Sequence, residues 1–116
     1  MGKFTVDRGT TFTIDIVYKK NGVAASLTGA TIRFTVKSSE FDTSTDDSTA
    51  LILKNVTSHT DPENGLSLIT LNPADTATIT PGKYRYDIKI AEAGGAVYKI
   101  DEGVLKIDGS PTNRLV

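Results

Sequence analysis

The residues best suited to chemistry are four acids in a stretch that contains no basic residue. They are Glu40, Asp42, Asp46 and Asp47. Calcium takes several carboxylate oxygens, so a cluster of this kind could hold the cation. The stretch lacks the Asp-x-Asp-x-Asp-Gly spacing of an EF-hand loop. We therefore favour a solvated acidic loop over a metal site.

His59 is the only histidine. A catalytic base needs a nucleophile and an orienting group, and no pattern in the sequence supplies either. We therefore interpret His59 as a surface residue of a turn. The 14 acidic residues single out no carboxylate pair for glycosidase chemistry, and Gly29, Gly65 and Gly82 are too dispersed for a phosphate-binding loop. The sequence predicts no catalytic, cofactor-binding or metal-binding residue, and no enzymatic activity.

Charge and hydropathy argue against two further classes of partner. Lys and Arg total 13, Asp and Glu total 14, and the net charge is −1. This balance leaves no basic footprint for nucleic acid and no polybasic patch for a membrane. No apolar run approaches the length that spans a bilayer, and the first residues lack the apolar stretch of a secretory signal. The length of 116 residues predicts one domain over 1–116.

Alternation of apolar and polar residues is the main structural signal. Ile14 and Ile16, for example, are flanked by polar Thr13 and Asp15, which is the period of a half-buried strand. We expect about seven short strands, over residues 4–6, 12–18, 31–37, 50–56, 66–71, 84–90 and 98–107. Residues 72–75 are predicted to form one helical turn, which Asn72 caps and Pro73 begins.

The last hairpin permits a prediction of register. A two-residue loop at 94–95 would set Ile88 opposite Asp101 and place a charge on the core side. A three-residue loop at 94–96 sets Ile90 opposite Ile100 and Lys89 opposite Asp101, which gives an apolar pair inside and an opposite-charge pair outside. We prefer the second register, with a bulge at Gly103. The charged ladder of these strands is then a soluble outer face.

Short strands with one apolar face each, and no long helical period, predict an all-β, immunoglobulin-like antiparallel β-sandwich. In immunoglobulin domains a tyrosine near the start of the sixth strand precedes a core cysteine by two residues. Tyr84 matches that tyrosine, and Tyr86 takes the place of the cysteine. We expect the Tyr84 hydroxyl to bond the backbone near residues 72–76, and Phe34 and Ile16 to join the core. Because cysteine and tryptophan are absent, two core tyrosines on another kind of sandwich remain the alternative.

Three stretches together resemble a known family. They are residues 9–16 (GTTFTIDI), 27–37 (LTGATIRFTVK) and 71–88 (LNPADTATITPGKYRYDI). Their order and spacing are similar to those of the immunoglobulin-like domain of tailed-bacteriophage structural proteins, including the N-terminal domain of baseplate upper proteins. The resemblance covers nearly the whole chain and carries no catalytic residue. It implies a virion structural protein of the baseplate, tail, neck or capsid surface.

This resemblance implies a non-enzymatic function through protein–protein contacts. The partners would be other virion proteins and identical copies of the chain, with no cofactor, nucleic acid or membrane. The expected location is the virion, after synthesis in the host cytoplasm. The expected contact regions are an edge strand at 3–6, the acidic loop at 38–49 and the tail at 113–116. The tail at 110–116 is expected to be loose or ordered by a partner. The candidate contact residues are Lys3, Phe4, Phe41, Asp46, Asp47, Asn113 and Arg114.

An alternative function on the same fold is a surface adhesion or carbohydrate-binding module. Sugar sites place exposed aromatic rings for stacking. Phe41 is the candidate ring, because the four tyrosines are assigned mostly to inward positions.

Overall fold

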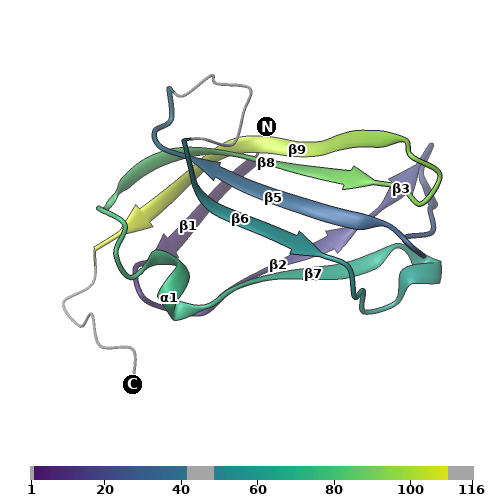
Figure 1. Cartoon of the computed structure of the whole chain (residues 1–116), viewed down its shortest axis with the longest axis horizontal. Coiled ribbons are helices and arrows are strands. Elements are labelled where there is room, and N and C mark those ends of the chain that lie inside the picture. Colours follow the sequence, from purple (N-terminus) through teal and green to yellow (C-terminus); the bar gives the residue numbers. More distant parts are fainter. Residues whose placement is uncertain (1, 42–48, 110–116) are drawn as a thin grey trace.

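The computed structural model describes residues 2–41 and 49–109 (Figure 1). Within these residues all seven predicted strands are present, and a short hairpin, β3–β4, lies between the second and third of them. The strands are β1 Gly2–Asp7, β2 Phe12–Val17, β3 Lys19–Lys20, β4 Val23–Ala24, β5 Thr31–Lys37, β6 Ala50–Val56, β7 Leu66–Leu71, β8 Gly82–Ala91 and β9 Val97–Asp108. A 3-10 turn, η1 Pro62–Asn64, precedes β7, and the predicted helical turn follows it as α1 Pro73–Thr76.

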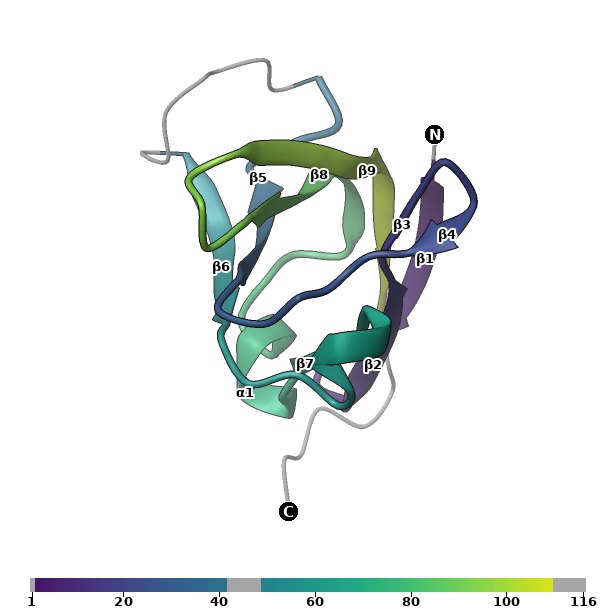
Figure 2. The ribbon, with the colours of Figure 1, turned by 90° about the vertical axis from the view of Figure 1, so that its right-hand side faces the viewer.

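The strands form two layers that face each other (Figures 1 and 2). One layer is a five-stranded sheet in the order β1-β9-β8-β5-β6, and the other is the β2–β7 pair. The adjacent strands β5, β8 and β9 opposite β2 and β7 reproduce the arrangement of an immunoglobulin-like sandwich. The fold is therefore an immunoglobulin-like β-sandwich, as the sequence predicted.

One pairing departs from the expected antiparallel arrangement. β1 runs parallel to β9, whereas the other paired strands are antiparallel. No hairpin links β1 to β9, so their relative direction is not set by a tight turn. After β1 the chain bends at Gly9, which has a φ of 76°, and enters β2 in the opposite layer.

The core lies between the two layers and contains all four predicted core residues. Tyr84, Tyr86, Phe34 and Ile16 are each less than one-tenth exposed. Tyr86 is the aromatic centre, because its ring lies 5.1 Å from that of Phe4 and 5.9 Å from that of Phe34. Burial of such rings is the largest favourable contribution to a core of this size.

The Tyr84 hydroxyl donates a hydrogen bond to the backbone carbonyl of Thr80. Its ring thus holds the corner before β8, as in the tyrosine corner of immunoglobulin domains. The acceptor is upstream backbone near the 72–76 turn, as predicted, and Thr80 lies four residues past the end of α1. Thr76 has another role, since its buried hydroxyl accepts the Gly9 N–H at 2.8 Å and ties the β1–β2 turn to α1.

The β8–β9 hairpin has a different register from the predicted one. Its loop has three residues, but they are residues 93–95, because the Glu92 N–H donates to the Ala96 carbonyl at 2.7 Å. Gly95 closes the loop with a φ of 98°, a conformation that glycine adopts without strain. The predicted pairs are therefore wrong, and the observed pairs are Ile90–Tyr98 and Lys89–Lys99.

The bulge in β9 lies at Ile100 rather than at Gly103. Lys89 pairs with Lys99 while Ile88 pairs with Asp101, so Ile100 is the extra residue. Beyond the bulge, β9 follows the register that places Asp101 on the core side. That position is tolerated because the Tyr86 hydroxyl donates a hydrogen bond to Asp101 at 2.8 Å.

Gly65 joins η1 to β7 where another part of the chain comes very close. Its φ is 73°, and its carbonyl accepts the Tyr18 N–H at 2.8 Å. A Cβ at this position would lie 2.5 Å from the Tyr18 carbonyl oxygen and 2.6 Å from that of Ala25. Gly22 has a similar φ of 79°, but a Cβ there would meet nothing within 4 Å.

We expect Gly65→Ala to destabilise the protein much more than Gly22→Ala. Both changes force alanine into a left-handed conformation, at a cost of about 1–2 kcal/mol. Gly65→Ala adds a backbone collision, which costs about a further 1–3 kcal/mol. Urea denaturation of the two variants measures the difference, and equal losses of unfolding free energy would contradict the close approach at Gly65.

Candidate interaction surface

His59 is a structural anchor rather than a solvated turn residue. Its ring is half-buried, with Nδ1 2.8 Å from the Ser67 hydroxyl and Nε2 2.8 Å from the Ala30 carbonyl oxygen. A carbonyl only accepts, so Nε2 carries the donated proton. The ring therefore fastens the turn before η1 to the start of β5. The sequence alone does not indicate that His59 contacts both the Ser67 hydroxyl and the Ala30 carbonyl.

The His59–Ser67 pair is not arranged for attack on a substrate. Ser67 is 4% exposed, and an acylating serine must reach a bound carbonyl group. The group that accepts the hydrogen bond from the His59 ring is a backbone carbonyl, and not the carboxylate of a catalytic triad. Neither residue lines the cavity of about 340 Å³ between β6 and β7. We read the pair as two satisfied polar groups at the edge of the core.

The cavity lies between the free edge of β6 and that of β7. Its walls are mainly polar, with Leu68 and Val56 as the apolar residues; the lining is Lys54, Asn55, Val56, Thr57, Ser58, Leu68 and Thr70. Lys54 forms an ion pair with Asp75 at 2.7 Å, which links β6 to α1. The groove is therefore a gap between two sheet edges and lacks a cluster of titratable groups.

A charged cluster joins the β3–β4 hairpin to the β8–β9 loop. Glu92 accepts a hydrogen bond from the Tyr18 hydroxyl at 2.7 Å and pairs with the Lys20 ammonium at 2.7 Å. The Lys20 ammonium also lies 5.1 Å from the centre of the Tyr98 ring. The hydrogen bond from Lys20, and then that from Tyr18, lowers the pKa of Glu92. These groups satisfy one another and act as a tie between two hairpins.

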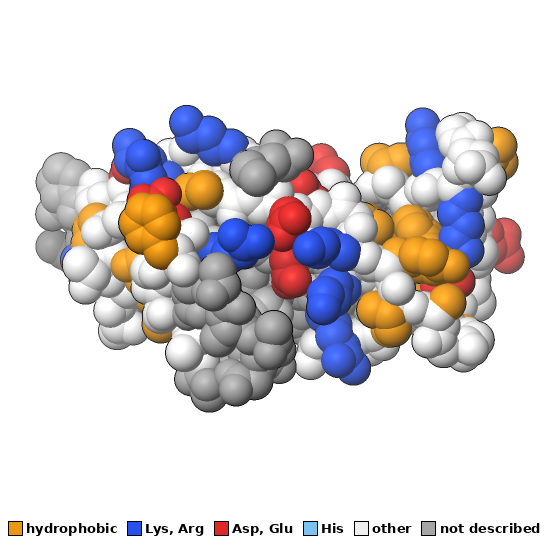
Figure 3. Space-filling view, turned by 90° about the horizontal axis from the view of Figure 1, so that it is seen from above, with side chains coloured by type: hydrophobic (Ala, Val, Ile, Leu, Met, Phe, Trp, Pro, Cys, Tyr) orange, Lys and Arg blue, Asp and Glu red, His pale blue; other side chains and the backbone are white. Residues whose placement is uncertain are grey.

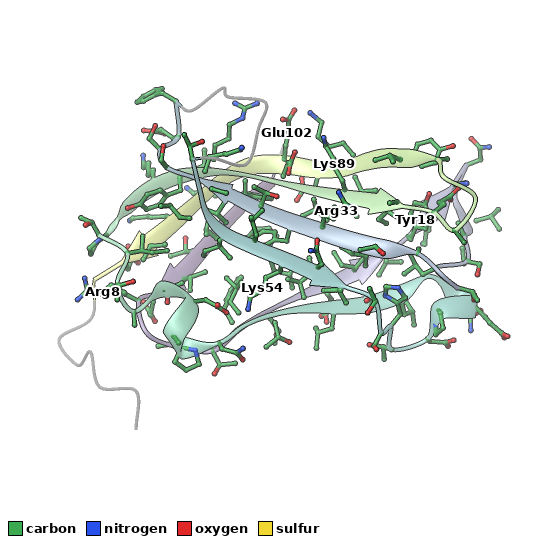
Figure 4. All side chains as sticks on the ribbon, viewed as in Figure 1. Arg8, Tyr18, Arg33, Lys54, Lys89 and Glu102 are labelled. Atoms are coloured by element: carbon green, nitrogen blue, oxygen red, sulfur yellow. The ribbon has the colours of Figure 1, made fainter. Side chains whose placement is uncertain are left out.

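Three cations lie side by side on the outer face of the five-stranded sheet. Arg33 of β5 is directly opposite Lys89 of β8, and Lys89 is directly opposite Lys99 of β9. All three side chains are exposed. Figure 4 shows Arg33 and Lys89 coming from neighbouring strands in the middle of the sheet. We call Arg33, Lys89 and Lys99 the basic row.

Two acids lie next to the basic row on the same face, because Asp87 of β8 is directly opposite Glu102 of β9. Glu102 pairs with Lys99 at 3.1 Å and with Arg85 at 3.1 Å. The hydrogen bond from Lys99 is the main reason why the pKa of Glu102 is lowered. Within the described residues, neither Arg33 nor Lys89 has a carboxylate partner. In Figure 3 basic and acidic side chains adjoin across the middle of the face, and hydrophobic side chains gather toward its right-hand end.

The sequence did not reveal this row. The predicted Lys89–Asp101 pair would have neutralised Lys89, and Arg33 lies in a strand for which no neighbours had been assigned. The alternating pattern shows that each of these residues faces outward. Which outward residues meet depends on the register of three strands, and the Ile100 bulge sets that register between β8 and β9.

The predicted contact residues lie in different environments. Lys3 is exposed on the edge strand β1. Phe4 is half-buried, and its ring packs 5.9 Å from that of Phe12, so it contributes to the core. Phe41 is 82% exposed. The other predicted contacts lie outside the described residues; they are Asp46, Asp47, Asn113 and Arg114. Asp42 of the acidic cluster also lies outside them.

No group of three or more His, Cys, Asp or Glu side chains is placed to hold a metal ion in residues 2–41 and 49–109. None of the helices in the same part of the chain has the length and apolar character needed to cross a bilayer.

Comparison with known proteins supports the fold alone. No protein-family model and no curated protein sequence matches the chain. The soluble domain of PmoD from Methylocystis sp. ATCC 49242 (Rockwell) aligns over 90% of this chain and 77% of that chain, with a TM-score of 0.52 and 5% identity. Murine CRIg aligns over 93% of this chain and 92% of that chain, with a TM-score of 0.40 and 12% identity.

The Tyr86–Asp101 hydrogen bond predicts a specific loss of stability at alkaline pH. Burial, and then the hydrogen bond to Asp101, raises the pKa of Tyr86 above its usual value of 10.0. In the unfolded chain the phenol ionises near pH 10, whereas in the folded protein it stays neutral. The stabilisation is thus complete below pH 10 and is lost as pH rises further.

We expect Tyr86→Phe to make this loss less steep by up to about 1.4 kcal/mol per pH unit above pH 10. Urea denaturation of both proteins between pH 9 and about pH 11.5 measures the slopes. The variant keeps a residual slope because burial also raises the pKa of Tyr18. Identical slopes would show that the Tyr86 hydroxyl is not held neutral by the fold.

Proposed function

We propose that this chain is a non-enzymatic structural protein of a tailed-bacteriophage virion that acts through protein–protein contacts. The observation that carries the proposal is the pair of open edges on the five-stranded sheet. Within the described residues, β1 and β6 each pair on one side only. An open strand edge is a ready template for another chain. The resemblance of residues 9–16, 27–37 and 71–88 to phage structural domains supports a virion as the assembly that the chain joins.

The two edges offer different chemistry to a neighbour. β6 carries exposed Leu51 and Leu53, which are 44% and 53% exposed, beside the groove that it shares with β7. Exposed leucines on an edge strand favour burial against a partner. β1 presents the cationic Lys3, while Phe4 anchors the strand in the core. The sandwich then acts as a rigid spacer whose edges are joined to other virion proteins or to further copies of itself.

The runner-up function is a surface adhesion or carbohydrate-binding module. The observation in its favour is Phe41, which is 82% exposed and lies within the acidic stretch, between Glu40 and Asp42 in the sequence. A sugar-binding site would need further groups around this ring, and Phe41 does not line the groove between β6 and β7. We therefore rank this function second.

We expect the chain to be present in particles at a fixed stoichiometry. Particles released by the strain that carries the gene are purified on a density gradient and probed with antibodies raised against the chain. Co-sedimentation with the particles and immunogold labelling of one virion region are the expected results. Absence from the particles would contradict the proposal. Binding on a glycan array that Phe41→Ala abolishes would then favour the adhesion module.

A further inference from the structure

The basic row has no evident structural purpose. Like charges placed directly opposite each other on neighbouring strands are unfavourable, and here Lys89 has a cation on both sides. Neighbouring strands lie about 4.8 Å apart, so the three cations sit on a short line across the sheet. Glu102 pairs with Lys99 at one end of the row, and within the described residues Asp87, which is opposite Glu102, forms no ion pair with Arg33 or Lys89. The row is therefore a concentrated positive site on an otherwise mixed face.

The same chain carries a stretch of opposite charge. Residues 38–49 contain four acids and no base. The first residues of this stretch are fixed beside the start of β8, because the Arg85 N–H donates to the Ser39 carbonyl at 3.2 Å and the Glu40 N–H donates to the Lys83 carbonyl at 3.1 Å. The chain therefore enters the acidic stretch at the end of the sheet where β5 finishes and β8 begins.

We propose that the basic row binds the acidic stretch of a second copy of this chain. The inference rests on the proposed function, for which it names a contact between identical subunits. Arg33 lies four residues before Lys37, the last residue of β5, so the row is about 13 Å from the end of the sheet that bears the stretch. Two complementary surfaces at different places on one chain produce a head-to-tail contact, which closes into a ring when the rotation permits.

The contact is tested by exchanging charges between its two sides. The first variant, Arg33→Glu with Lys89→Glu, reverses most of the row and leaves the acidic stretch unchanged. The second variant, Asp46→Lys with Asp47→Lys, reverses part of the acidic stretch and leaves the row unchanged. A control variant, Lys19→Glu with Lys106→Glu, makes the same change in net charge as the first variant but alters two exposed lysines that lie outside the row and do not hold the acidic stretch.

Sedimentation velocity at high protein concentration, at low and at high salt, gives the readout. We expect the unmodified chain and the control to self-associate at about 0.01 M salt, where the screening length is about 30 Å, and to dissociate at about 1 M, where it is about 3 Å. Each charge-reversed variant should associate at least tenfold more weakly. An equimolar mixture of the two should assemble again, because each then offers the other a complementary side.

Several results would overturn the inference. One is that the unmodified chain stays monomeric at low salt. This result is also the one expected if the acidic stretch binds the basic row of its own chain. Others are a control that loses association as fully as the first variant, and a mixture that remains monomeric. Circular dichroism of every variant confirms that it is folded. If virions contain the chain but the mixture does not assemble, the inference fails while the proposed function stands. If the mixture assembles but virions lack the chain, the contact between copies stands while the proposed function fails.

Discussion

The hydrogen bond from Tyr86 to Asp101 is the interaction on which the rest of the larger sheet depends. It allows β9 to keep a carboxylate on the core side, opposite the buried Ile88. That register in turn requires one extra residue, Ile100, between the β8–β9 loop and the central part of the strand. Tyr86 also links Phe4 of the edge strand to Phe34 of β5 by ring contacts. One side chain therefore sets both the core of the sandwich and the alignment of its outer face.

As a consequence, the outer face has an excess of positive charge at one place, the basic row. The predicted register would have paired Lys89 with Asp101 and reduced the positive charge at this place. Instead Asp101 points toward Tyr86, and Lys89 lies between Arg33 and Lys99. Unfavourable local charge at a defined site is typical of surfaces used for recognition rather than for stability. The proposed contact between copies follows from this single shift of one residue.

The sequence predicted what depends on local pattern and missed what depends on contacts between distant residues. The strands, the α1 turn and the buried Tyr84, Tyr86, Phe34 and Ile16 follow from period-two alternation and capping residues, which are local properties. The predicted hairpin register was wrong because a carboxylate on the core side needs a hydrogen-bond partner that local pattern does not show. The partner of Asp101 is Tyr86, which lies 15 residues away in the sequence. The anchoring of His59 and the parallel β1–β9 pair depend likewise on tertiary contacts.

The register of β8 and β9 is tested most directly by engineered disulfides, because the chain contains no cysteine of its own. Directly opposite residues in an antiparallel pair have Cα atoms about 4.5–5.5 Å apart, which suits a disulfide. The structure predicts that Lys89→Cys with Lys99→Cys forms an intramolecular disulfide on mild oxidation of the folded protein. It predicts that Lys89→Cys with Asp101→Cys does not, because those side chains lie on opposite faces of the sheet. Cross-linking of the second pair and not of the first would contradict the register and, with it, the basic row.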